Sequence, residues 1–334
     1  MAFKMATPAS SKTRDSASPE IKSAPPGGFF FPPRRHWVAS FSLFYAVCSA
    51  LVPDIFVWGG PKTSECLVAS YNLENYTLRA SDRTHLKSIP AREAVADVVA
   101  EAHPDILGVC EIGSEDALAD LRERLVRRGV VFTDVEFVEG PDPDRHVALL
   151  SRFPIVQRNS MRKVPFELNG MPELVRRGFL DVSIAITPAY VLRLVGVHLK
   201  SKLPIPEGEA LVRRMEAQLL REHLDGILGE NPQVQLLVYG DFNETREEAA
   251  IHAVQGSRGA LNALHELAAQ DGNGERWTHY RQFSDVYSRV DYFFASKALK
   301  AHLVPGGSRI SQAPQWRKAS DHRLISTLLS PERR

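Results

Sequence analysis

The sequence contains little cysteine, no long apolar run and almost no net charge. Its three cysteines cannot build a disulfide framework, and no group of Cys and His residues has the spacing of a structural zinc site. The longest uncharged apolar stretch, residues 37–52, has 16 residues, whereas a membrane-spanning helix needs about 20. The formal net charge of +1 argues against a protein that binds long nucleic acid mainly by neutralising its phosphates.

Several common catalytic motifs are also missing. The chain has no G-x-S-x-G, no P-loop and no H-E-x-x-H, which disfavours a serine hydrolase, a nucleotide-hydrolysing ATPase and a zinc protease. The remaining composition is 44% hydrophobic and 24% charged residues, typical of a globular protein with a sizeable core. It excludes a chain disordered throughout, a collagen and a multi-span membrane protein.

The first 64 residues differ in composition from the rest of the chain. They carry seven basic and three acidic side chains, whereas residues 65–334 are slightly acidic. Residues 1–33, rich in Ser, Pro and Ala, are expected to be disordered. Arg34 and Arg35 followed by the apolar run predict an export signal, with an uncleaved anchor, or neither, as the alternatives. Because positive charge stays inside, a signal or an anchor places residues 65–334 outside the cytoplasm, in the periplasm, in the medium or at a membrane surface.

Residues 65–334 alternate between short β-rich runs and helical stretches. In residues 91–103 apolar side chains recur at the spacing of one helix face, and Ser114 followed by two acidic residues predicts another helix start. Such alternation, with neighbouring strands that can form hairpins, predicts an α/β protein with mixed sheets. The expected strands are 66–72, 105–111, 147–151, 179–186, 191–198, 235–240, 290–295 and 324–329, and a long helix is expected at 209–228.

Two further expectations follow from this pattern. If strands 66–72 and 105–111 run parallel, Cys66 and Cys110 lie at opposite ends of the sheet, so both are expected to be free buried thiols. The stretches 162–177 and 269–283 are irregular, and irregular loops are where functional groups concentrate.

Polar and acidic side chains follow apolar strands repeatedly. A buried strand has no reason of its own to end in Asp or Glu, whereas ligands of α/β sheets bind at strand ends. The tetrapeptide Gly-Asp-Phe-Asn at 240–243 is the most specific of these signals. Asp291 stands instead at the beginning of its strand. The strand-end residues are Asn72, Glu74, Glu111, His198, Lys200, Asp241, Asn243, Asp321 and His322.

In order along the chain, these motifs resemble those of the endonuclease/exonuclease/phosphatase superfamily of deoxyribonuclease I-like phosphoesterases. The resemblance runs from Val68 to about Leu329 and covers most of the expected domain 65–334. It implies a four-layer α/β sandwich, with two mixed β-sheets packed face to face and helices outside. It also implies a divalent-metal-dependent phosphoester hydrolase with one site at the open end of the sheets.

The resemblance also implies a role for each motif residue. Glu111 is the expected principal metal ligand, with Glu74 and Asp321 as further acidic groups near the metal. Asp241 positions or deprotonates the attacking water, and Asn243 helps to orient it. The remaining implied roles are a hydrogen-bond donor to phosphate for Asn72, an imidazole beside the phosphate for His322, the carboxylate that orients this imidazole for Asp291, and a strand histidine leading into the site for His198.

Elementary chemistry supports such roles. Mg²⁺ (or Mn²⁺) prefers one or two carboxylates plus waters and substrate oxygens, which suits Glu111 with Glu74. A carboxylate such as Asp241 can act as a base toward water, and a charged His322 held by Asp291 can stabilise the growing negative charge. Whether Asp241 or a metal-bound hydroxide attacks, and whether there is one metal or two, stays open.

Each signal has a structural alternative. His198 is alternatively a core histidine with a satisfied hydrogen bond, and Lys200 and Lys202 are either an ordinary charged strand exit or phosphate contacts. We expect Arg145 and His146 at the surface. The pair 176–177 either caps a loop or contacts substrate. The aromatic stretch 277–280 is expected to pack at a rim, with stacking on a base as the alternative.

The functional alternatives are a nuclease, a lipid-headgroup (sphingomyelinase-like) or small-molecule phosphodiesterase, and a catalytically inactive member that serves as a binding module. An inactive member is expected to have lost part of the motif set, and every motif residue is present. The expected partner is a phosphoester substrate, with nucleic acid among the candidates. No stable protein partner is implied, and we expect a monomer.

Overall fold

The computed structural model describes residues 65–81 and 84–333. All of them belong to one compact unit, Gly60–Arg334. The expected export signal and the boundary at residue 64 lie outside the described residues, so both stay predictions. Within the described ranges, no helix is long and apolar enough to cross a membrane.

The first of two six-stranded sheets has the order β15-β16-β1-β2-β4-β3. Strands β1 and β2 run parallel, and the other neighbours are antiparallel. The parallel pair requires a crossover, which the helix after β1 supplies. The strands are β1 (Cys66–Tyr76), β2 (Ile106–Ile112), β3 (Asp134–Val138), β4 (His146–Ser151), β15 (Arg309–Ile310) and β16 (Ile325–Leu329).

The second sheet has the order β11-β14-β10-β9-β8-β5. Strands β9 and β10 run parallel, and the other neighbours are again antiparallel. Two small hairpins, β6-β7 and β12-β13, lie outside both sheets. The strands are β5 (Ile155–Arg158), β6 (Pro165–Leu168), β7 (Met171–Leu174), β8 (Leu180–Thr187), β9 (Tyr190–His198), β10 (Leu236–Asp241), β11 (His265–Glu266), β12 (His279–Arg281), β13 (Val286–Ser288) and β14 (Asp291–Ala295).

Three hydrophobic layers hold the sheets and helices together. Side chains of both sheets, such as Val68 and Leu237, form the central layer. Residues such as Val95 of α2 pack on the outer face of the first sheet, and residues such as Leu220 of α4 pack on that of the second. The helices are α2 (Ile89–Ala102), α3 (Glu115–Val126), α4 (Glu209–Glu230), α5 (Ala249–Gln255), α6 (Lys297–Lys300), α7 (Trp316–Ala319) and the 3-10 turn η1 (Gln282–Ser284).

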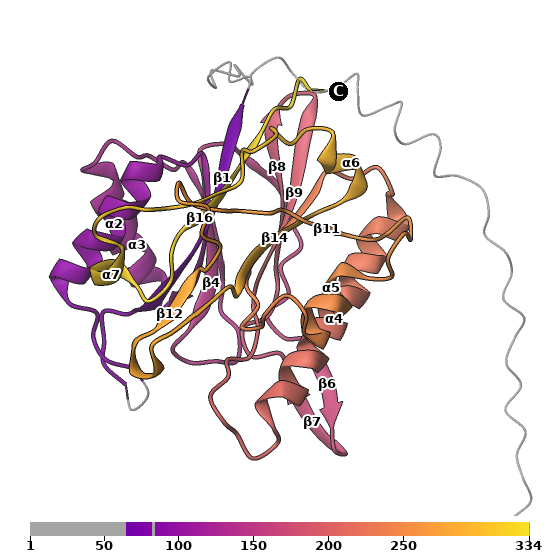
Figure 1. The fold of residues 1–334 in the computed structure, drawn as a ribbon, viewed down its shortest axis with the longest axis horizontal. Coiled ribbons are helices and arrows are strands. Elements are labelled where there is room, and N and C mark those ends of the chain that lie inside the picture. Colours follow the sequence, from indigo (N-terminus) through magenta and orange to yellow (C-terminus); the bar gives the residue numbers. More distant parts are fainter. Residues whose placement is uncertain (1–64, 82–83, 334) are drawn as a thin grey trace, which may run out of the picture. The chain divides into compact units, whose positions relative to one another are not determined.

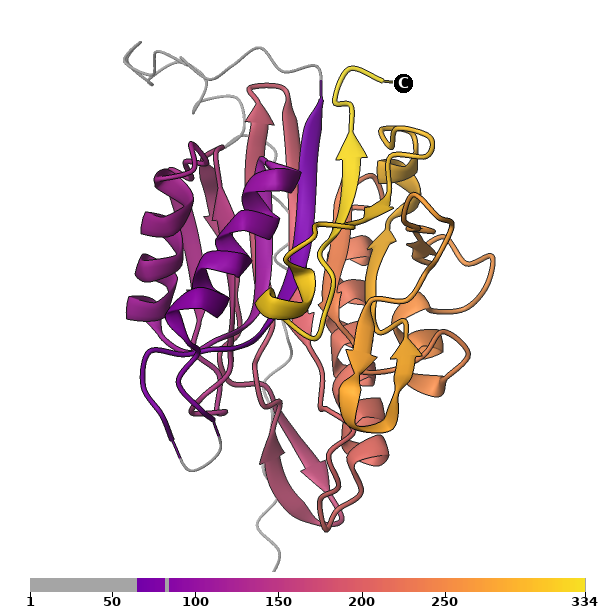
Figure 2. The ribbon, with the colours of Figure 1, turned by 60° about the vertical axis from the view of Figure 1, so that its left-hand side comes forward.

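The result is the expected four-layer α/β sandwich, with α2, α3 and α7 on one side and α4 and α5 on the other (Figures 1 and 2). Apolar periodicity located α2, α3, α4 and the long strands, because each of these elements presents an apolar face to a hydrophobic layer. The short helices α5 and α7 were not predicted. The stretch 162–177 is not irregular, since it holds the β6-β7 hairpin. Cys66 and Cys110 are free and buried, as expected.

The topology brings the motif residues to one end of the molecule. Strands β1, β2, β9 and β10 end there, and the antiparallel β14 begins there with Asp291 directly opposite Asp241. Strand β16 is antiparallel to β1, so the residues that precede it arrive at the same end. This explains why Asp291 stands at the start of its strand whereas the other acidic residues stand at strand ends.

Candidate active site

The backbone leaves regular strand geometry where the site begins. The pairing of β1 with β2 shifts register beyond Asn72, and φ is positive at Glu74 (48°), Glu111 (62°) and Asn243 (50°). A positive φ at a non-glycine residue costs free energy and persists only where the surroundings hold it. Three of the predicted site residues therefore occupy left-handed conformations that the fold enforces.

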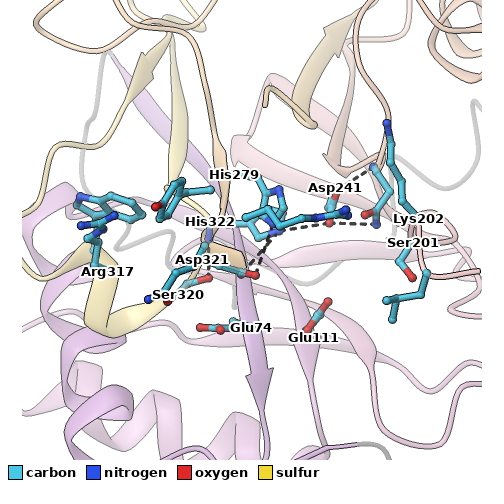
Figure 3. A pocket seen from close by; sticks show the side chains of 16 residues that line it. Glu74, Glu111, Ser201, Lys202, Asp241, His279, Arg317, Ser320, Asp321 and His322 are labelled. Carbon is cyan, nitrogen blue, oxygen red and sulfur yellow. Dashed lines mark hydrogen bonds and ion pairs between the residues drawn. The ribbon is translucent and has the colours of Figure 1, made fainter. Parts of the chain in front are cut away.

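These strand ends surround a cavity of about 560 Å³ (Figure 3). Six of the nine predicted site residues line it directly. The other three, Asn72, His198 and Asp291, are buried behind the lining and contact it through hydrogen bonds or close polar approaches. The lining residues among the predicted set are Glu74, Glu111, Asp241, Asn243, Asp321 and His322.

Asp241 lies at the centre of a hydrogen-bond network between the two sheets. Its Oδ2 accepts from Nδ2 of Asn72 at 2.9 Å and from Nδ2 of Asn243 at 3.2 Å. Its Oδ1 accepts from the backbone N–H of Asn243 at 2.7 Å. Burial, partly offset by His322, raises the pKa of Asp241 to about 7. The carboxylate is thus fixed in place and more basic than an exposed one.

His322 is held by Asp291, as the sequence predicts. Its Nδ1 lies 2.8 Å from Oδ2 of Asp291, and its Nε2 faces Oδ2 of Asp241 at 3.8 Å. Burial alone would lower the pKa of His322, but the Asp291 and Asp241 carboxylates raise it well above the usual value. The ring is therefore kept as an imidazolium in the cavity wall.

Two hydroxyl groups fix this pair in position. The Ser320 hydroxyl donates to the backbone carbonyl of Asn72 at 2.8 Å and accepts from the N–H of His322 at 3.0 Å. The Thr278 hydroxyl accepts from the N–H of Asp291 at 3.1 Å. The first links the loop before β16 to β1, and the second links the loop before β12 to β14.

Glu111 presents its carboxylate from the end of β2. Its Oε2 accepts from the N–H of Asn75 at 2.8 Å, and its Oε1 lies 3.4 Å from Nδ2 of Asn72. On the neighbouring strand β1, burial and then the charges of Asp321 and Glu111 raise the pKa of Glu74, although Lys87 opposes them. Crowded carboxylates of this kind are hard oxygen donors whose repulsion a divalent cation would offset. The residues present therefore fit the expected metal.

The tightest groups of ligating side chains lie beside these glutamates. Within the described ranges, the ligand atoms of His279, Asp321 and His322 lie within 4.8 Å of one another, as do those of Asp241, Asp291 and His322. Neither group includes Glu74 or Glu111. Because Mg²⁺ needs only one or two protein carboxylates and keeps several waters, a cage of three is not required for Glu111 to hold it.

Within residues 65–81 and 84–333, His198 does not show the satisfied hydrogen bond that the alternative of a core histidine requires. Neither of its ring nitrogens has a partner among the described residues. Its Nε2 lies 3.6 Å from Oδ2 of Asp241 and 3.7 Å from Oε1 of Glu111. Burial and then Arg177 lower the pKa of His198 well below its usual value. A neutral imidazole therefore stands ready for a water or a substrate oxygen.

Of the basic residues near the site, some hold loops in place and others line the cavity. The Lys200 ammonium donates to the carbonyls of Ser201 and Leu203 at 2.8 and 2.9 Å, so it shapes its own loop. Arg177 pairs with buried Asp142 at 3.0 Å and likewise holds a loop. Lys202, in contrast, lines the cavity.

Arg145 and His146 are not surface residues, so that expectation is wrong. His146 is buried at the start of β4, because the antiparallel β4 begins beside the end of β2. The Arg145 guanidinium approaches Oε2 of Glu111 at 3.7 Å. It stands beside the expected metal ligand.

The sequence pattern did not identify several residues of the site. The ring of His279 lies 4.6 Å from that of His322, and its Nε2 lies 3.5 Å from Asp321. The Lys87 ammonium approaches Glu74 at 3.8 Å. The only sequence signal for His279 was its place in the aromatic stretch 277–280, and Lys87 gave none.

Gly240 lets the motif strand β10 approach β9. Its φ is +139°, and a Cβ there would lie 1.9 Å from the carbonyl oxygen of Val197. We expect Gly240→Ala to lower the free energy of unfolding more than Gly129→Ala does. Gly129 also has a positive φ (77°) but open space around it, so its variant shows the cost of a positive φ without a steric contact. Overpacking typically adds about 1–3 kcal/mol, which urea unfolding of both variants would measure. Equal losses would mean that the close approach is relieved without cost.

Comparison with known proteins agrees with this architecture. The catalytic domain of human Nocturnin, solved with a bound sulfate anion, has 18% identity and a TM-score of 0.57, covering 80% of this chain and 94% of that one. Truncated TDP2 of Caenorhabditis elegans has 18% identity and a TM-score of 0.56, covering 80% and 98%. Sphingomyelinase C of Streptomyces griseocarneus has 17% identity and a TM-score of 0.56, covering 80% and 100%.

These likenesses establish a shared fold. No curated protein matches the chain in sequence. A model of one family matches residues 69–322, which span every motif residue from Asn72 to His322. The chain therefore belongs to the endonuclease/exonuclease/phosphatase family.

Proposed function

We propose that this chain is a divalent-metal-dependent phosphodiesterase. Members of its family are generally hydrolases that act on phosphoesters. The observation that carries the proposal is the line of polar contacts from Asp291 through His322 to Asp241, beside a cavity that also holds Glu111. It combines an imidazolium, a base and an anionic metal ligand around one cavity, the set of groups that metal-assisted phosphoester hydrolysis uses.

In this proposal Glu111 holds the metal, with Glu74 or Asp321 as a second carboxylate. Bound Mg²⁺ or Mn²⁺ offsets the negative charge of the phosphate. The carboxylate of Asp241 accepts a proton from the attacking water. Its raised pKa, about 7, suits a general base that works near neutral pH. The Asn72 and Asn243 amides fix the direction of that carboxylate.

His322 acts beside Asp241 in the cavity wall. Its Nδ1 is held by Asp291, and its Nε2 lies in the cavity wall 3.8 Å from Oδ2 of Asp241. The imidazolium donates to a phosphate oxygen as negative charge grows there. The neutral ring of His198 accepts or donates one further hydrogen bond to a water or a phosphate oxygen, which would satisfy its orphaned nitrogens.

The rival function is an inactive binding module. Such a module has no need of a base with a raised pKa or of three strained backbone positions at the cavity. A screen of the purified protein on bis(4-nitrophenyl) phosphate, 4-nitrophenyl phosphate, a single-stranded oligonucleotide and sphingomyelin vesicles tests the proposal. Metal-dependent hydrolysis of a diester supports it, and no turnover of any substrate with Mg²⁺ or Mn²⁺ would refute it.

We also propose that the enzyme works outside the cytoplasm, with the mature chain starting near residue 51 if the apolar run 37–52 is cleaved. The support is the sequence alone, namely Arg34 and Arg35 before an uncharged run. Mass spectrometry of the native protein from separated cell fractions measures both points. An intact N-terminus in the soluble cytosolic fraction would contradict the proposal.

A further inference from the structure

One wall of the catalytic cavity takes no part in the proposed chemistry. It consists of Tyr280 on β12 and of Trp316 and Arg317 on the short helix α7, beside Asp321 and His322 (Figure 3). Tyr280 and Trp316 are half-buried, and Arg317 is exposed. Planar side chains next to a phosphate site are suited to bind a planar part of the substrate.

The wall is a stack of rings and guanidinium groups. The Tyr280 and Tyr287 rings stack with centroids 4.4 Å apart and an angle of 27°. The Arg317 guanidinium lies 4.8 Å from the Tyr280 centroid and 5.5 Å from that of Trp316. Such a stack can be extended by a further planar group, because a guanidinium or an indole offers a π face.

Trp277 supports the stack from behind. Its ring packs against Trp316 with centroids 5.2 Å apart, and the guanidinium of Arg323 covers it at 4.2 Å. Arg323 is itself held by a buried ion pair with Asp271 at 2.9 Å. The two sequence alternatives for residues 277–280 therefore apply to different residues: Trp277 packs, whereas Tyr280 faces the cavity.

Positive charge accompanies the stack. Arg281 and Arg317 line the cavity, and neither has an ion-pair partner within the part of the chain that the structure describes. Lys202 stands at the cavity as well, although Glu244 pairs with it at 2.7 Å. These cations lie along the opening of an otherwise slightly acidic body, so they favour an anion at this place rather than over the whole surface.

The binding surface continues past the catalytic cavity. A second cavity of about 270 Å³ shares Lys202, Asn243, His279 and Arg281 with the first. It extends the surface toward Thr245 and Val286. A substrate bound in the first cavity can therefore extend into the second.

We propose that the substrate is a short single-stranded nucleic acid, with one base stacked on the Trp316–Arg317 wall and a neighbouring phosphate near Arg281. This inference rests on the proposed function, because it places the scissile phosphodiester in the cavity that His322 and Asp241 line. A nucleic acid strand combines planar groups with repeated phosphates, and that combination matches a cationic, aromatic groove. A lipid headgroup offers the phosphate but no planar group to stack.

The test compares two substrates with Mn²⁺ present. For the wild type, Trp316→Ala, Trp316→Phe and Arg317→Ala, kcat/KM is measured on a single-stranded oligonucleotide and on bis(4-nitrophenyl) phosphate. We expect the ratio of the two constants to fall roughly 5- to 150-fold in Trp316→Ala, as for the loss of one stacked base. Trp316→Phe should restore most of the ratio. Arg317→Ala should lower it and flatten its dependence on salt.

Phe283→Ala is the matched control. This fully exposed aromatic residue lies in the β12-β13 hairpin that carries Tyr280, but it does not line the cavity. It should leave the ratio unchanged. Unchanged ratios in Trp316→Ala and Arg317→Ala would overturn the inference, and so would activity on sphingomyelin vesicles that Phe283→Ala abolishes. Fluorescence anisotropy of the labelled oligonucleotide gives a readout without turnover. Binding that depends on Trp316, without hydrolysis of either diester, would support the inference and refute the proposed function.

Discussion

Glu111→Gln is expected to abolish hydrolysis while leaving the fold intact. The substitution removes the ligand charge but keeps the side-chain volume, and the amide oxygen can still accept the 2.8 Å hydrogen bond from Asn75. Because even the loss of an outer-shell partner typically costs 10- to 100-fold at a metal site, we expect a loss of more than about 100-fold. The measurement is kcat/KM on bis(4-nitrophenyl) phosphate across a range of Mg²⁺ and Mn²⁺ concentrations.

Two comparisons separate the metal from other effects. Excess EDTA should silence the wild type, and Mg²⁺ or Mn²⁺ should restore it. Glu123→Gln, on the exposed side of α3, removes the same charge far from the cavity and should leave activity near the wild-type value. Full activity of the wild type in EDTA, or of Glu111→Gln without added metal, would show that Glu111 does not hold a catalytic ion.

The site residues at strand ends could be predicted because the apolar strands are recognisable in the sequence and the sheet topology brings their ends together. Buried strands are apolar throughout, so an acidic side chain directly after one stands out. Parallel β1 and β2, together with parallel β9 and β10, then place Glu111 and Asp241 at one end of the molecule. The Gly-Asp-Phe-Asn sequence was a specific signal because a chance match to four fixed residues is rare. Its Gly240 then allows the close approach of β10 to β9.

The rest of the site could not be predicted, because it depends on contacts between distant segments. The Ser320 hydroxyl reaches the carbonyl of Asn72, 248 residues away in sequence. His279 lies beside His322 because the strand β12 forms a bridge with the loop before β16. Nor does a local pattern reveal that Arg145 precedes the strand next to β2 and so approaches Glu111.

His322 and Asp291 are expected to behave as one unit. Loss of an electrostatic or acid–base partner typically slows turnover by roughly 10²–10⁴-fold, so His322→Ala should fall in that range. Asp291 does not line the cavity. It acts on the site through the 2.8 Å contact between its Oδ2 and Nδ1 of His322. Asp291→Ala should therefore slow the reaction by a comparable factor, and the double variant should be little slower than His322→Ala alone, since groups that act together are strongly non-additive.

The pH dependence distinguishes positioning from mere structural support. The Asp291 carboxylate raises the pKa of His322, so its loss lowers that pKa and the imidazolium disappears at a lower pH. In Asp291→Asn, which keeps the volume, the alkaline limb of the kcat/KM profile should move to lower pH, whereas a purely structural role would lower the profile without moving it. Phosphodiester hydrolysis by His322→Ala, Asp291→Ala, the double variant and Asp291→Asn at saturating Mg²⁺ checks both points. Independent, multiplicative losses with an unmoved alkaline limb would mean that the hydrogen bond between Asp291 and His322 has no part in turnover, and that Asp291 serves only to begin β14 opposite Asp241.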